Sequence, residues 1–104
     1  MANAQLSSTH FFAVTLSIKG TVQGVFYRAT ASTVAKQVGV VGYVRNMRDG
    51  SVQLCAEGTM AQLHQLIDWC KQGPPMATVH SVTQTEPIHQ ISHPTFLDFS
   101  VRRT

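Results

Sequence analysis

Two glycines and an arginine near the start of the chain have the spacing of an anion-binding loop. Residues 20–28 read G-T-V-Q-G-V-F-Y-R, between an apolar strand-like run and a helical pattern that begins near Tyr27. Gly20 and Gly24 permit a tight turn and leave backbone N–H groups unobstructed. The free amides of a helix start converge on one point, and Arg28 adds a planar charged fork suited to phosphate or carboxylate oxygens. The alternative explanation of this motif is purely structural: the turn from strand to helix needs glycine, and the arginine lies in solvent.

A second motif, G-Y-V-R-N-M-R-D-G-S-V, occupies residues 42–52. Together the two motifs resemble the signatures of the acylphosphatases, small enzymes that hydrolyse carboxyl–phosphate anhydrides. The first matches G-x-V-Q-G-V-x-[FY]-R, and the second matches an aromatic-V-[KR]-N strand end followed by a D-G turn. Weaker similarities, W-x-x-x-G-P at 69–74 and F-S-V-R at 99–102, extend the resemblance over nearly the whole chain from about Phe12.

The resemblance implies roles for individual residues. Arg28 is expected to bind the substrate phosphate, and Asn46 is expected to orient the attacking water through its amide, which both donates and accepts hydrogen bonds. The alternative for Asn46 is a turn-favouring residue that closes a strand. Backbone amides of the loop are expected to complete the phosphate cage, namely those of Gln23, Gly24, Val25, Phe26 and Tyr27.

Two positions depart from the family's common pattern. Phe26 stands where many relatives have a small residue, and Met47 follows Asn46 where a hydroxyl residue is frequent. Neither change removes a group that the chemistry needs. Both are expected to influence the rate or the acyl group preferred.

Hydrolysis of an acyl phosphate requires few chemical groups from the protein. The leaving carboxylate has a conjugate acid of pKa about 4, so it departs without a general acid. Phosphoryl transfer depends mainly on positioning and on electrostatic stabilisation of an anionic transition state. A cradle of amides, one guanidinium and a water-holding group suffice. We therefore expect no cofactor and no metal, with inorganic phosphate acting as product and competitive inhibitor.

The order of predicted elements is β-α-β-β-α-β with one further strand. Period-2 alternation predicts the strands, and 3.6-residue spacing predicts the helices. Asp49-Gly50 indicates a hairpin, and Thr59 with Gln62 forms a capping-box pattern. This order is typical of an α+β, ferredoxin-like fold, an antiparallel sheet with two helices on one face. The expected strands are 12–18, 40–46, 51–57, 78–85 and one containing Leu97, Phe99 and Val101; the expected helices run from Tyr27 to Gly39 and from Thr59 to Gly73.

Length and composition describe one small domain. Of the 104 residues, 1–10 are expected to be disordered or extended, and 11–104 to form the acylphosphatase-like domain. The start has no signal-peptide pattern, and no apolar run approaches the roughly 20 residues that span a bilayer. A cytoplasmic monomer without a membrane partner is expected. The net charge of +3 is spread over scattered basic residues, which does not favour nucleic acid.

The cysteines and histidines give weaker signals. Cys55 and Cys70 are expected to lie on opposite sides of the sheet as free thiols. His89 and His93 are four residues apart, but Pro87 and Pro94 flank them in a predicted loop without a third ligand at suitable spacing. No metal site is predicted.

Three other functions fit the same topology. RNA-recognition domains stack bases on aromatic residues of the first and third strands, and residues 51–57 contain no aromatic residue. A metal-carrying ferredoxin-like domain needs a C-x-x-C in its first loop, which is absent. A non-catalytic anion-binding or regulatory domain remains the main alternative to an enzyme.

Overall fold

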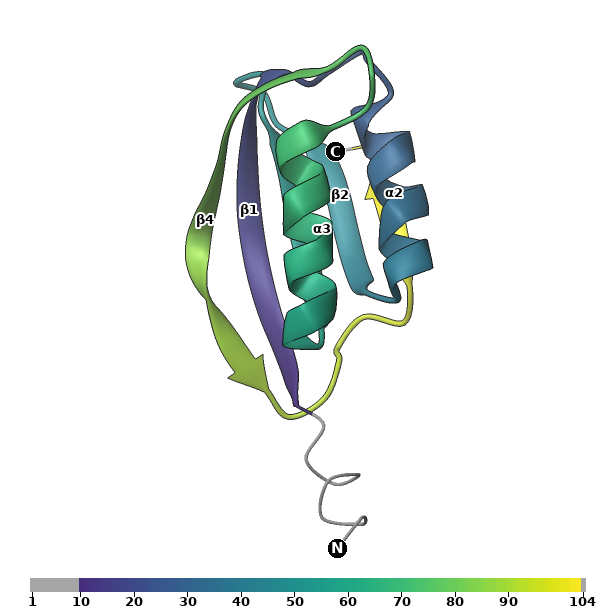
Figure 1. The fold of residues 1–104 in the computed structure, drawn as a ribbon, viewed down its shortest axis with the longest axis vertical. Coiled ribbons are helices and arrows are strands. Elements are labelled where there is room, and N and C mark those ends of the chain that lie inside the picture. The colour runs from purple at the N-terminus through teal and green to yellow at the C-terminus, as the bar shows by residue number, and fades with distance from the viewer. Residues whose placement is uncertain (1–9, 104) are drawn as a thin grey trace, which may run out of the picture.

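A five-stranded sheet carries two helices on one of its faces (Figure 1). The computed structural model describes residues 10–103, so the predicted N-terminal segment 1–10 lies outside the described residues except for His10. The helices α2 and α3 lie side by side over the sheet and run roughly along its strands, as the ferredoxin-like prediction requires. The elements in chain order are β1 (Phe11–Thr21), α2 (Tyr27–Val38), β2 (Val41–Asn46), β3 (Val52–Gly58), α3 (Met60–Gln72), β4 (Thr78–Ile91) and β5 (Phe99–Arg102).

The strands are arranged in the order β4-β1-β3-β2-β5. Four of them form an antiparallel sheet, but β5 pairs with β2 in parallel, so the sheet is mixed rather than wholly antiparallel. The reason is the crossover after β4. That edge strand ends at the same end of the sheet at which β2 begins. The chain then crosses this end to the opposite edge, so β5 runs in the same direction as β2 (Figure 1).

A buried carboxylate holds this crossover in place. Glu57, only 5% exposed, accepts hydrogen bonds from the backbone N–H of Thr95 (2.7 Å) and of Phe96 (3.1 Å). The hydroxyl of Thr95 donates to the second oxygen of Glu57 at 2.6 Å. The ring of Phe96 then packs edge-on against Tyr43, with 5.7 Å between ring centroids. These contacts hold the segment before β5 in place, so that β5 pairs with the edge of β2.

The core lies between the sheet and the helices. Alternate residues of β1 are fully buried there, because every second strand side chain faces the helices. Facing them, each helix buries one stripe at a spacing of three to four residues. The principal core residues are Val14, Leu16, Ile18, Tyr27, Ala31, Ala35, Val44, Val52, Leu54, Leu63, Leu66, Cys70 and Phe99.

Local signals in the sequence mark the element boundaries correctly. Thr59 and Gln62 form the predicted capping box, with the Gln62 N–H donating to Thr59 Oγ1 and the Thr59 N–H to Gln62 Oε1. Gly39 caps α2 with φ 99°. In the β2–β3 hairpin, Asp49 Oδ1 accepts from both the N–H and the hydroxyl of Ser51, and these bonds lower the pKa of Asp49.

The strand β4 is longer and less regular than predicted. It continues through Pro87 and His89 to Ile91, where the sequence indicated a loop. Its pairing with β1 shifts register three times, and at each shift β4 advances one residue more than β1. Such bulges bend a strand and increase its twist. The outer strand in Figure 1 is visibly bent.

Candidate active site

The loop between β1 and α2 has the backbone of an anion cradle. Gly24 has φ 75°, and Phe26, the residue before the helix, has φ 66°. No side chain in the described part of the chain caps this helix start. The first hydrogen bond back to the loop is donated by the Thr30 N–H to the Phe26 carbonyl, at 3.1 Å. The amides of the first turn therefore have no intrahelical acceptor and are available to an anion.

The two glycines of the motif have different roles, which corrects the sequence interpretation. Gly24 sits in the loop, and a Cβ there would meet nothing within 4 Å, so its side faces open space. Gly20 belongs to β1. A Cβ on Gly20 would lie 2.1 Å from the Thr78 carbonyl oxygen, so this glycine permits the close approach of β4 rather than forming the cradle.

Arg28 projects from the first turn of α2. Its Nη1 donates to the carbonyl of Arg102 at 3.0 Å, which ties the guanidinium to the end of β5. Among residues 10–103 the other N–H groups of the fork have no acceptor, so they can donate to oxygens of a ligand. An arginine held in this way has already lost part of its side-chain freedom, so less entropy remains to be lost on binding.

Asn46 is the last residue of β2 and pairs with Val52 across the hairpin. Its Oδ1 is buried and has no hydrogen-bond partner among the described residues. A buried acceptor without a partner is unusual, because its desolvation is not compensated. Asn46 therefore holds hydrogen-bonding capacity that the described part of the fold does not use.

One cavity brings these groups together. It measures about 330 Å³, and both predicted catalytic residues line it. Two arginines and no carboxylate contribute to its wall, which gives it the electrostatics of an anion site. The full lining is Val22, Gly24, Phe26, Tyr27, Arg28, Ala29, Asn46, Val101 and Arg103.

The side chain of Gln23 connects the two motifs. Its Nε2 donates to the carbonyls of Met47 (2.8 Å) and Ser51 (2.9 Å), so the cradle is fastened to the β2–β3 turn that carries Asn46. The sequence motif predicts only a backbone role for Gln23. The contribution of Val101 and Arg103 to the cavity was also missed, although the F-S-V-R similarity at 99–102 pointed to this part of the chain.

The side chain of Tyr27 is buried and has a structural role. Its hydroxyl donates to the Cys70 carbonyl at 2.8 Å and its ring lies 5.2 Å from that of Trp69, so the side chain anchors α2 to α3. Burial raises the pKa of this hydroxyl far above its usual range. Val25 is likewise buried, in the core.

The other predicted groups do not form a second centre. Cys55 and Cys70 are free thiols, Cys70 in the core and Cys55 half-buried on the opposite side of the sheet. Burial raises the pKa of both, that of Cys70 to about 12. Within residues 10–103, no group of three His, Cys, Asp or Glu side chains is placed to hold a metal ion, and no helix is long and apolar enough to span a membrane.

Known proteins of one family match this chain over most of its length. The acylphosphatase family model matches residues 14–100. An acylphosphatase from Shewanella amazonensis is 43% identical over 91 residues, 88% of this chain and 97% of that protein. The solved acylphosphatase from Coxiella burnetii has a TM-score of 0.80 at 30% identity, covering 92% of this chain and 99% of its own. The Bacillus subtilis acylphosphatase has a TM-score of 0.78 at 25% identity, covering 88% and 98%. With a match that includes both Arg28 and Asn46 of the cavity lining, the chain belongs to the acylphosphatase family.

Proposed function

We propose that Arg28, the loop amides and Asn46 carry out the acylphosphatase reaction of this chain, the hydrolysis of an acyl phosphate to a carboxylate and inorganic phosphate. One observation supports this most strongly. The charged fork of Arg28, the helix start without a side-chain cap and the side chain of Asn46 border a single cavity, and no carboxylate is among its lining residues.

The phosphate is the part of the substrate that the site holds. The backbone N–H groups of residues 23–27 and the fork of Arg28 surround its oxygens, and these donors are in place before the substrate arrives. As the P–O bond to the acyl group breaks, negative charge spreads over the equatorial oxygens and the leaving carboxylate. Preorganised donors stabilise that charge without any reorganisation.

Asn46 positions the water. Its amide N–H₂ donates a hydrogen bond to the water, and its Oδ1, which has no partner among residues 10–103, accepts another once the amide turns toward the cavity. A neutral amide is no base, so the proton of the water passes to an oxygen of the substrate phosphate. The carboxylate leaves unprotonated, because the pKa of its conjugate acid is only about 4.

Inhibition by phosphate, independence of metals and a monomeric cytoplasmic state complete the proposal. Inorganic phosphate presents the same oxygens to the same donors and acts as product and competitive inhibitor. The reaction proceeds without a divalent metal, because amides and guanidinium supply the positive potential. The protein works as a cytoplasmic monomer. The competing hypothesis is a domain of the same fold that binds anions without catalysis.

The test compares two substrates of the purified protein. Benzoyl phosphate should be hydrolysed readily and p-nitrophenyl phosphate barely, because no side chain of the cavity can act as a general acid for a poorer leaving group. Comparable rates on both would refute the proposed mechanism. Phosphate-induced stabilisation without hydrolysis of any acyl phosphate would instead support the non-catalytic alternative.

A further inference from the structure

Phe26 combines two features that disfavour folding. It is the only non-glycine residue among those described with positive φ, at 66°, and its side chain is 73% exposed. Left-handed backbone is unfavourable for a residue with a Cβ, and an exposed aromatic ring gains little from folding. Glycine or asparagine would provide the same turn with less strain. The fold therefore gives no reason for a phenylalanine here, and strain of this kind is concentrated at functional sites.

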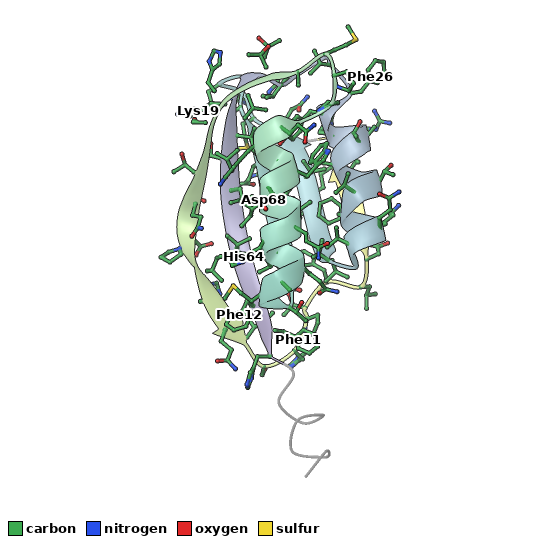
Figure 2. The ribbon with its side chains drawn as sticks, in the orientation of Figure 1. Phe11, Phe12, Lys19, Phe26, His64 and Asp68 are labelled. Carbon is green, nitrogen blue, oxygen red and sulfur yellow. The ribbon has the colours of Figure 1, made fainter. Side chains whose placement is uncertain are left out.

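The ring stands at the rim of the catalytic cavity. Phe26 lines the same space as Arg28 and Asn46, at the end of the molecule where α2 begins (Figure 2). Val101 of β5, 40% exposed, also lines this space. Two exposed apolar side chains from different elements thus border a site whose other functional groups are polar.

The geometry of in-line attack places the acyl group on the side of the phosphate away from Asn46. In phosphoryl transfer, the attacking and leaving oxygens lie roughly in line on opposite sides of phosphorus. With the water on Asn46, the acyl group must leave on the other side of the phosphate. A second cavity of about 580 Å³, lined by Arg45, Asn46, Met47, Arg48 and Arg103, begins at Asn46 and extends over the β2–β3 turn. This basic cavity is on the water side and is therefore not the place for the acyl group.

We propose that Phe26 and Val101 form an apolar wall for the acyl group, so that the enzyme selects acyl phosphates with an aromatic or large apolar acyl group over small ones. This inference rests on the proposed function of the cavity. The wall is open to solvent, so its contribution is that of an exposed aromatic contact, roughly 2- to 10-fold in kcat/KM. An enclosed pocket would discriminate more strongly.

The experiment measures kcat/KM for benzoyl phosphate and for acetyl phosphate and takes their ratio. Phe26→Asn removes the ring while keeping a residue that tolerates left-handed backbone. Damage to the phosphate cradle would lower both rates and cancel in the ratio. The ratio should fall roughly 2- to 10-fold in Phe26→Asn and by less in Phe26→Leu and Val101→Ala. Met76→Ala, which alters another exposed apolar residue outside the cavity, should leave it unchanged.

Two results would overturn the inference while the enzyme remains an acylphosphatase. One is a ratio that does not change in Phe26→Asn. The other is a wild-type preference for an acyl phosphate with a carboxylate on its acyl group that Arg48→Ala abolishes, because the acyl group would then occupy the basic cavity. A wild-type protein that hydrolyses none of these substrates would overturn the proposed function as well.

Discussion

Replacing Asn46 with alanine should make the protein more stable and much less active. The buried Oδ1 of Asn46 has no partner among residues 10–103, and an unpaired buried acceptor costs roughly 1–3 kcal/mol. Alanine removes that penalty but also some packing, so we expect a net gain of about 1 kcal/mol in the free energy of unfolding. For a domain of this size, that corresponds to a rise of about 4 °C in Tm.

Turnover should change in the opposite direction. Without the amide, the attacking water is no longer held in line, and loss of one preorganised hydrogen-bonding group typically costs about 10²–10³ in kcat. Phosphate should still raise the Tm of Asn46→Ala, because the cradle is intact. Urea unfolding, phosphate titration followed by thermal melting, and steady-state kinetics on benzoyl phosphate measure the three quantities.

A matched variant separates this behaviour from ordinary damage to the sheet. Gln53 is also a strand amide, but its Oε1 accepts from Arg45 Nε at 2.8 Å and from the hydroxyl of Tyr43 at 3.3 Å, and it does not line the catalytic cavity. Gln53→Ala should lower stability slightly and leave kcat near the wild-type value. If Asn46→Ala instead lost stability and activity together, or kept near-normal turnover, Asn46 would be a structural residue.

Three further predictions concern the guanidinium of Arg28, divalent metals and the pH dependence of stability. Arg28→Ala should abolish both phosphate protection and turnover, and Arg28→Lys should restore little because a point charge cannot replace the fork; phosphate protection that survives in Arg28→Ala would contradict this. Chelators should leave hydrolysis unchanged, whereas a loss reversed by one metal would disprove the metal-free mechanism. Stability should fall as pH rises from about 9 towards 12, because the unfolded state releases the Cys70 proton near pH 9 while burial raises the folded pKa to about 12. Tyr27, whose pKa burial also raises, acts in the same direction, so Cys70→Ala should reduce the slope of stability against pH without removing it.

The residues that belong to local patterns were predictable from the sequence. Arg28 lies four residues after Gly24, and the short turn from β1 to α2 is enough to bring its guanidinium to the free backbone amides. Asn46 was assigned by its motif, and the structure places it on the same cavity. The capping box at Thr59 was likewise recognisable, because both of its hydrogen bonds join residues within one turn of helix.

The features that the sequence does not predict depend on tertiary contacts or on irregular pairing between strands. The side chain of Gln23 finds its acceptors on another element, and no spacing within the chain reveals this. Arg103 reaches the cavity only because the crossover carries the chain to the edge of β2. In β4, each bulge resets the alternation between the two faces, so the inside–outside pattern that identifies a strand disappears where Pro87 and His89 lie.

The bulges of β4 also affect how copies of the protein meet. An exposed strand edge is a template on which another chain can add its own strand, the first step of many aggregation processes. The edge formed by β4 bends, carries extra unpaired residues and contains Pro87, which has no N–H to donate. The opposite edge, β5, spans only Phe99–Arg102. Neither edge offers a long, flat row of hydrogen-bonding groups, so the sheet is protected from growing by edge-to-edge addition of further copies.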